Sequence, residues 1–273
     1  LSWLVMDVFL SCTILNSVTS GSLDISGAQL VKVILLLSLV MLISYAFGAL
    51  VARVFFKGRE NTPVFELLIS VMNNIFIGLP IAEALYGATA VLYCALSCIP
   101  YNLLLYSYGV WRLRSGKAID SGAAFKIKDV FTVPLFATLA ALLIFIFDIQ
   151  LPYILRELIS TTASATRPAS MIVIGATLGG IPLTEAFREK WVYLLCALRL
   201  VILPALTWLV LSPLTQDALL LKTCVLLAAC PSGVVVTVLS LQYDYDASYS
   251  SKGILVGTML SMITLPIWAI ILG

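Results

Sequence analysis

The expected fold depends on one stretch, Asn73-Asn74-Ile75-Phe76-Ile77-Gly78-Leu79-Pro80, which lies inside an apolar segment spanning 64–85. A segment of this length can cross a bilayer. Pro80 cannot donate to a helical ladder and Gly78 is a poor helix former, so we expect the helix to break near these two residues. Backbone groups freed at mid-membrane must be buried in protein or line a wet cavity. The amides of Asn73 and Asn74 can donate and accept there, so we expect Asn73, Asn74, Gly78 and Pro80 to form part of a transporter's substrate site.

A second stretch has the same character. The sequence Ala229-Cys230-Pro231-Ser232-Gly233 interrupts another apolar segment, 219–241. An offset of 157 residues, from Tyr86 to Tyr243, superimposes the two interrupted segments (243 − 86 = 157). The same offset pairs the apolar blocks 31–54 with 188–211 and 90–111 with 247–268. Paired, interrupted segments in two halves predict an inverted repeat with a binding site where the breaks meet. On the second segment we expect this site to include Pro231, Ser232, Gly233 and Thr237.

The composition indicates a multi-span helical membrane protein. Of 273 residues, 61% are hydrophobic and 11% are charged, against about 25% charged in soluble domains. Mean hydropathy is +1.08. The sequence contains no histidine, which excludes histidine-based metal sites and nucleophilic triads. We therefore expect no enzyme activity, metal or cofactor, and the basic residues lie in loops rather than in a surface suited to nucleic acid.

The hydropathy pattern predicts nine membrane spans, at 1–19, 30–55, 63–86, 90–111, 130–148, 154–180, 190–212, 218–242 and 250–272. An inverted repeat of five helices requires ten, so we expect a further helix to precede Leu1. Alternating the spans places eleven loop lysines and arginines on one side and three on the other. The positive-inside rule makes the first side cytoplasmic. We therefore expect the loop 112–129 in the cytoplasm and the C-terminus outside, in the plasma (inner) membrane.

The two breaks favour an anionic ligand. Each break creates a helix N-terminus at mid-membrane, which carries about half a positive charge and free N–H donors. A carboxylate could bind there with no lysine or arginine in the pocket, because the broken segments contain no basic residue apart from Lys222 at the outer edge. Three charged residues could add a charge or a coupling role. Arg199 either attracts an anion, pairs with a carboxylate or reaches an interface, and Glu83 and Asp7 either lie at an interface or carry a proton.

The motif from Asn73 to Pro80, followed by Tyr86-Gly87, resembles the Asn-x-x-Phe-x-Gly-x-Pro signature of the auxin efflux carrier (PIN-like) family. The stretch from Cys230 to Gly233 resembles the second crossing of that family, and the short central loop fits its bacterial branch of malate or malonate permease-like proteins. The family often has Asn-Thr in place of Asn73-Asn74, and a proline in place of Ser11, so pocket chemistry and substrate differ among relatives.

The resemblance implies an all-α fold of two inverted five-helix repeats, crossed at two proline-broken helices. It also implies a scaffold domain, 1–19 and 130–180, and a transport domain, 30–111 and 190–272. A homodimer through the scaffold domain is a further expectation. The function expected is secondary transport of a small organic anion, such as a mono- or dicarboxylate, by alternating access.

Two alternatives remain open at this point. One is a sodium-coupled symporter of the bile-acid type, which shares the crossed-helix plan, and either H⁺ or Na⁺ could be the coupling ion. The other is a membrane sensor that binds a ligand without moving it. Dependence of uptake on sodium would identify the symporter, and binding without uptake would identify the sensor.

Overall fold

The structure is a computed structural model, and it describes residues 4–19, 27–116, 133–147, 149–166, 168–169, 172 and 183–273. Every regular element within these ranges is a helix, which confirms the all-α prediction. In the described part of the chain, four helices are long and apolar enough to cross a membrane: Gln29–Phe55, Ala88–Ser115, Lys190–Leu211 and Ala247–Leu272. Shorter apolar helices accompany them, so the chain has the character of a multi-span membrane protein.

The first half begins with a π-helical turn, η1 (Leu4–Phe9), that continues into α1 (Leu10–Thr19). The next elements are α2 (Gly27–Phe55), α3 (Thr62–Ser70), η2 (Asn74–Gly78), α4 (Leu79–Tyr86), α5 (Ala88–Leu104), η3 (Leu105–Gly109) and α6 (Val110–Gly116). Most of the loop expected at 112–129 lies outside the described residues.

The second half begins with α7 (Val133–Ile146) and α8 (Tyr153–Ser164). Most of the expected span 154–180 beyond α8 lies outside the described residues. The chain continues with α10 (Leu183–Arg188), α11 (Lys190–Ala197), η5 (Leu198–Ile202), α12 (Leu203–Leu211), α13 (Ala218–Ala229), α14 (Val235–Gln242) and α15 (Ala247–Leu272).

The helix ends follow local sequence signals. Asp217 accepts a hydrogen bond from the Leu220 N–H at 3.0 Å and caps α13, and Asp246 accepts from the Ser248 N–H at 2.8 Å and caps α15. Gly87, with a φ of 76°, ends α4 in a backbone conformation that favours glycine. Asp217 therefore marks the start of α13 and Gly87 the end of α4, both in broken helices, while Asp246 marks the start of the long helix α15.

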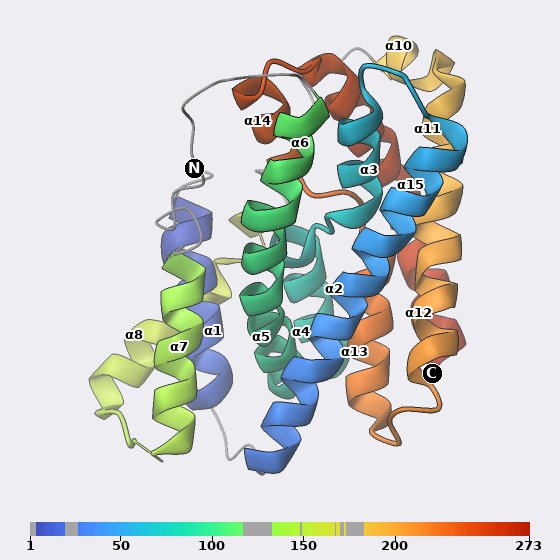
Figure 1. Cartoon of the computed structure of the whole chain (residues 1–273). Helices are drawn as coiled ribbons and strands as arrows, with labels where there is room; N and C mark the ends of the chain where they lie inside the picture. The colour runs from blue at the N-terminus through green and yellow to red at the C-terminus, as the bar shows by residue number, and fades with distance from the viewer. Residues whose placement is uncertain are drawn as a thin grey trace.

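The two broken helices run in opposite directions (Figure 1). In this view α3 and α14 lie in the upper half of the molecule, whereas α4 and α13 lie in the lower half. The first broken helix therefore descends and the second ascends, and their breaks meet between the halves. Each broken helix follows one long helix in the chain and precedes another, α2 and α5 in the first case and α11–α12 and α15 in the second. This is the inverted, crossed arrangement that the sequence predicts.

The first break differs in position from the prediction. It spans residues 71–73 and not Gly78–Pro80, because α3 ends at Ser70 and a new helix begins at Asn74. Gly78 and Leu79 donate their N–H groups to carbonyls five residues earlier, those of Asn73 and Asn74, in a wide π-helical turn. This turn ends directly before Pro80, which occupies the first turn of α4, where its missing N–H is tolerated.

Three helices form a group of their own on the left of Figure 1. Helix α1 packs against α7 and α8, and both α1 and α7 also contact α5. These three helices are the described part of the segments that we expect to form the scaffold domain. Helix α5 is the element through which they contact the helices of the crossing.

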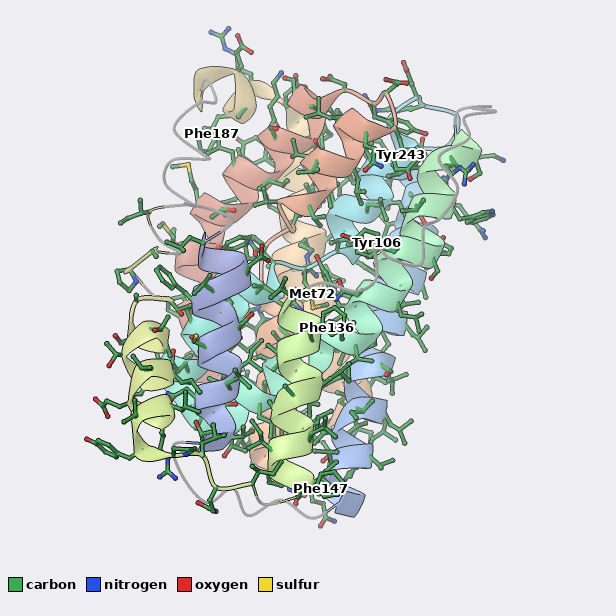
Figure 2. The ribbon with its side chains drawn as sticks, turned by 90° about the vertical axis from the view of Figure 1, so that its left-hand side faces the viewer. Met72, Tyr106, Phe136, Phe147, Phe187 and Tyr243 are labelled. Carbon is green, nitrogen blue, oxygen red and sulfur yellow. The ribbon has the colours of Figure 1, made fainter. Side chains whose placement is uncertain are left out.

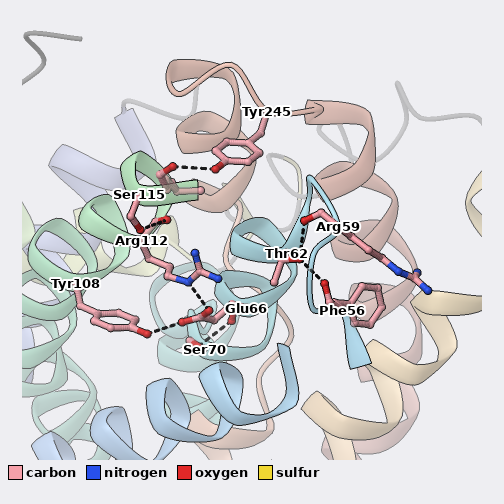
Figure 3. Close-up of polar contacts among 10 residues, drawn as sticks. Phe56, Arg59, Thr62, Glu66, Ser70, Tyr108, Arg112, Ser115 and Tyr245 are labelled. Atoms are coloured by element: carbon pink, nitrogen blue, oxygen red, sulfur yellow. Dashed lines mark hydrogen bonds and ion pairs between the residues drawn. The ribbon is translucent and has the colours of Figure 1, made fainter. Parts of the chain in front are cut away.

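A buried carboxylate links α3 to η3 and α6 (Figure 3). Glu66 is 1% exposed, and it accepts from the Tyr108 hydroxyl at 2.6 Å and from the Arg112 Nε at 2.7 Å. Both carboxylate oxygens of Glu66 therefore have strong partners. We assign Glu66 to holding the first half of the broken helix in place, because short hydrogen bonds from Tyr108 and Arg112 fix both of its carboxylate oxygens.

Candidate functional site

The two breaks form a short antiparallel pair of extended segments. The Asn73 N–H donates to the Pro231 carbonyl at 2.8 Å, and the Gly233 N–H donates to the Val71 carbonyl at 2.9 Å. Between these bonds, Met72 and Ser232 face each other as an antiparallel bridge. The pairing satisfies backbone groups that neither half-helix can reach, which a membrane interior requires. The breaks are therefore adjacent, as the inverted repeat predicts.

Proline explains the second break directly. Cys230 is extended, with a φ of −61° and a ψ of 146°, because the residue before a proline avoids the helical region. The first break has no proline within it, and the extended backbone at Val71 is held by its bond from Gly233. Pairing with the second broken segment therefore keeps residues 71–73 extended, although the local sequence at 71–73 does not by itself require a break.

A cavity of about 80 Å³ lies beside the crossing. The described residues that line it come from both breaks and from α5–η3: Met72, Asn73, Asn74, Ile75, Phe76, Tyr101, Asn102, Leu105, Tyr106, Gly233, Val234 and Val235. Figure 2 places Met72 and Tyr106 near mid-height of the molecule. Of the eight residues expected to bind substrate, three line this cavity, namely Asn73, Asn74 and Gly233.

Both new helix N-termini contribute to the cavity wall. The backbone N–H groups of Ile75, Val234 and Val235 have no carbonyl acceptor among the described residues, as expected in the first turn of a helix. The Asn73 side-chain oxygen accepts from the Phe76 N–H at 3.3 Å, while its amide nitrogen has no described partner. The site therefore offers several N–H donors at the positive ends of two helix dipoles.

Asn74 is held more firmly than Asn73. Its amide nitrogen donates to the Ser97 hydroxyl at 3.0 Å, and Ser97 in turn donates to the Cys94 carbonyl at 2.6 Å. These bonds tie the start of the second half-helix to α5. Asn74 therefore lines the cavity, but its amide nitrogen is already hydrogen-bonded to Ser97 of α5.

The sequence prediction missed the aromatic and α5 part of the wall. Phe76 lies in the quoted motif but was not chosen, and Tyr101, Asn102 and Tyr106 lie on the apolar helix that follows it. A signal for these residues exists, because polar groups at 101, 102 and 106 interrupt an otherwise apolar span. The described lining contains no lysine, arginine, aspartate or glutamate, so no side-chain charge competes with a ligand there.

Two expected site residues have packing roles instead. A methyl group on Gly78 would lie 2.9 Å from the Leu227 Cδ2 and 3.2 Å from the Cys230 Sγ, so glycine lets η2 approach the end of α13. Pro80 is buried in the first turn of α4 and does not line the cavity. Gly233, which does line the cavity, also allows close approach, since a methyl group there would lie 3.2 Å from the Met72 carbonyl oxygen.

The other three candidates on the second broken segment, Pro231, Ser232 and Thr237, contact neighbouring segments and do not line the cavity. Ser232 is buried and donates its hydroxyl to the Leu68 carbonyl at 2.5 Å, which satisfies a free carbonyl at the end of α3. The Pro231 carbonyl accepts from Asn73 within the crossing. Thr237 lies 3.5 Å from the Ser251 hydroxyl and does not line the cavity.

The three charged candidates occupy different places. Arg199 is buried in η5, with 1% exposure, and donates from Nη1 to the Ala228 carbonyl at 3.1 Å, at the end of α13. Glu83 in α4 and Asp7 in η1 are half-buried, and neither lines the cavity. Among the described residues there is no group of three or more acidic or cysteine side chains that could hold a metal.

Comparison with known proteins defines the class. A family model described as "Membrane transport protein" matches residues 1–269. An uncharacterized transporter of Methanothermobacter thermautotrophicus is 25% identical over 218 residues, which cover 79% of this chain and 70% of the relative. An uncharacterized transporter of Methanocaldococcus jannaschii is 25% identical over 263 residues, covering 92% and 83%.

With the apolar helices and the crossing, these similarities define a multi-pass membrane transporter. The chain belongs to the membrane transport protein family, the auxin efflux (PIN-like) family that the motif at 73–80 resembles.

Proposed function

We propose that the protein is a secondary transporter that binds the carboxylate of a small organic anion at the crossing and moves it by alternating access. One observation carries the proposal: residues of two helix N-termini and Asn73 line one cavity whose described lining has no acidic side chain. A carboxylate can accept from several N–H donors at once, and such charge-assisted bonds are about twice as strong as neutral ones.

The rest of the cavity suits the remainder of such a ligand. Phe76, Tyr101 and Tyr106 supply aromatic surface beside the donors. An apolar part of the anion would pack against these rings, while the hydroxyl and amide groups fix its orientation. The cavity is small, so the ligand would be a compact mono- or dicarboxylate.

The transport movement would occur between two groups of helices. In the proposal, α1, α7 and α8 belong to a scaffold that also forms a homodimer, and the crossing with its flanking helices moves against it. The loop 112–129 would lie in the cytoplasm and the C-terminus outside, as the distribution of lysine and arginine favours. Coupling to H⁺ or Na⁺ is compatible with this arrangement.

A matched ligand series tests the proposal. Benzoate, benzamide and phenyltrimethylammonium share a ring and differ in charge from −1 to 0 to +1. A hydrogen bond to a charged group contributes about 1.5–3 kcal/mol, so we expect benzoate to bind about ten to a hundred times more tightly than benzamide. Binding is measured by thermal stabilisation of the purified protein in detergent, because a ligand of the folded state raises its apparent stability.

Transport is measured in the same system. Uptake of radiolabelled benzoate into proteoliposomes, with and without a sodium gradient, separates the mechanisms. Uptake that requires sodium would favour the symporter, and binding without uptake would favour the sensor. If phenyltrimethylammonium binds as tightly as benzoate, the site is not built for anions and the proposal is wrong.

Asn73 offers a variant that separates binding from stability. Asn73→Asp keeps an oxygen that can accept from the Phe76 N–H but removes the amide donor and adds a negative charge. An acidic group at a helix N-terminus is favourable for stability, so the variant should fold and lose at least about tenfold in benzoate affinity. Asn61→Asp is the control, because Asn61 forms no side-chain cap and lies outside the cavity. Unchanged benzoate affinity in Asn73→Asp would show that Asn73 is structural.

A further inference from the structure

Arg199 has an unusual environment for a charged residue. It lies in η5, a wide π-helical turn inside the long helix formed by α11 and α12, and it is the largest side chain that is fully buried. Turns of this kind often occur at functional sites, because they redirect one side chain out of the helical register. Here the redirected side chain reaches the last turn of α13, next to the second break.

The charge of Arg199 lacks a counterion among the described residues. Its one hydrogen bond is to the neutral Ala228 carbonyl, and its Nε and Nη2 have no partner. Arginine stays protonated in proteins, and a buried arginine is ordinarily paired with a carboxylate. The negative end of the α13 helix dipole compensates part of the charge. The Ala228 carbonyl at that end accepts a hydrogen bond from one of the three guanidinium nitrogens, Nη1.

Arg199 is anchored next to the second break, because its acceptor Ala228 lies two residues before Cys230, where the backbone becomes extended. Tyr101 lines the cavity beside that break. The Tyr101 hydroxyl lies 3.4 Å from the position of a methyl group on Gly233, so the ring reaches the extended pair itself. No acidic side chain lines the cavity among the described residues, so none there cancels the positive charge of Arg199.

We propose that Arg199 is the specificity-determining residue of the crossing: its fixed charge, placed at the end of α13 beside the second break, makes the cavity select anions over neutral ligands of the same shape. Binding of a monoanion then neutralises the crossing, whereas the empty cavity leaves one buried positive charge uncompensated. This inference rests on the proposed function, because it assumes that the ligand occupies the cavity beside the breaks. Arg199 does not line that cavity, so its effect is electrostatic and does not require contact.

Two substitutions and one control test the inference. Arg199→Gln removes the charge and keeps a donor for Ala228, and Arg199→Met removes both while filling the same space. Replacing a buried charge by an apolar side chain of similar volume is often neutral or stabilising. Lys32→Gln is the control, because Lys32 carries the same charge on an exposed face of α2. The probes are benzoate and benzamide, and the readouts are affinity and apparent melting temperature without ligand.

We expect substitution of Arg199 to leave thermal stability unchanged or raised and to lower the selectivity for benzoate over benzamide. Without ligand, Arg199→Met melts no lower than the parent, and in both Arg199 variants the preference for benzoate over benzamide falls at least tenfold. Benzamide affinity stays within threefold, and Lys32→Gln behaves as the parent. A folded Arg199 variant that retains the parent's preference overturns the inference. Failure of both variants to fold also overturns it, because Arg199 is then a structural cap of α13. A parent without any preference for benzoate contradicts the proposed function itself, which distinguishes the two failures.

Discussion

Gly78 provides the sharpest test of the packing in the crossing. Gly78→Ala adds a methyl group 2.9 Å from the Leu227 Cδ2 and 3.2 Å from the Cys230 Sγ. Overpacking of this kind costs about 1–3 kcal/mol, while replacing a helical glycine by alanine gains about 0.5–1 kcal/mol. The net destabilisation expected is therefore about 0–2.5 kcal/mol. The cost depends on the Leu227 Cδ2 atom, so removing that atom should make Gly78→Ala stabilising.

Leu227→Ala removes that atom. Leu227 is fully buried, and its truncation alone costs about 2–5 kcal/mol. In this background the added methyl group occupies the vacated space, so Gly78→Ala should stabilise the protein by about 0.5–1 kcal/mol. The double-mutant cycle therefore gives an interaction free energy of about 1–3 kcal/mol.

The assay is thermal unfolding in detergent, followed by tryptophan fluorescence, for the parent, both single variants and the double variant. A change of 1 kcal/mol corresponds to about 2–4 °C in melting temperature for a protein of this size. Benzoate affinity is measured on each folded variant and should follow stability only weakly, because Gly78 does not line the cavity. Equal destabilisation by Gly78→Ala in both backgrounds would refute the packing role.

Two further predictions concern residues that hold the broken helices. Ser232→Ala removes the donor to the Leu68 carbonyl and leaves that carbonyl buried, so it should cost about 1–3 kcal/mol in thermal unfolding. Benzoate affinity of the folded variant should stay unchanged, and a selective loss of affinity would place Ser232 in the site. Glu66→Gln keeps the acceptor for Tyr108 but removes the charge that faces Arg112, which is 22% exposed. We expect a loss of about 1–2 kcal/mol, reduced from that of a fully buried pair by solvation of Arg112. A double-mutant cycle with Arg112→Gln measures this coupling, and additive losses would contradict it.

The sequence was sufficient to predict the crossing because two independent signals agreed. Pro231 dictates an extended residue before it, and the offset between the halves indicates where its counterpart lies. The second break therefore falls where predicted, with Cys230 extended. The first break does not, because no residue at 71–73 forbids a helix on its own. The bonds between Asn73 and Pro231 and between Gly233 and Val71 hold it, and these are contacts between distant segments that local propensity does not contain.

The site was only partly predictable for a similar reason. Polar residues at a break are expected to face a ligand, yet Ser232 turns to a free carbonyl of α3 because an unsatisfied carbonyl in the membrane is costly. Tyr101 and Tyr106 belong to a neighbouring apolar helix, where tyrosines ordinarily pack, and only the fold brings them to the cavity. Arg199 was a candidate from sequence, but its position behind the crossing depends on η5.

The account is tested most directly by measuring whether a carboxylate lies against the Asn73 amide. Protein labelled with [¹⁵N]asparagine is reconstituted with benzoate carrying ¹³C at its carboxyl carbon, and the ¹³C–¹⁵N dipolar coupling is measured by solid-state NMR. A hydrogen bond of ordinary length places the two nuclei less than about 4 Å apart. We expect a coupling of that strength in the parent, its loss in Asn73→Asp and its persistence in Asn61→Asp. Bound benzoate without a coupling to asparagine nitrogen would show that the carboxylate lies away from the crossing and that the proposed site is wrong.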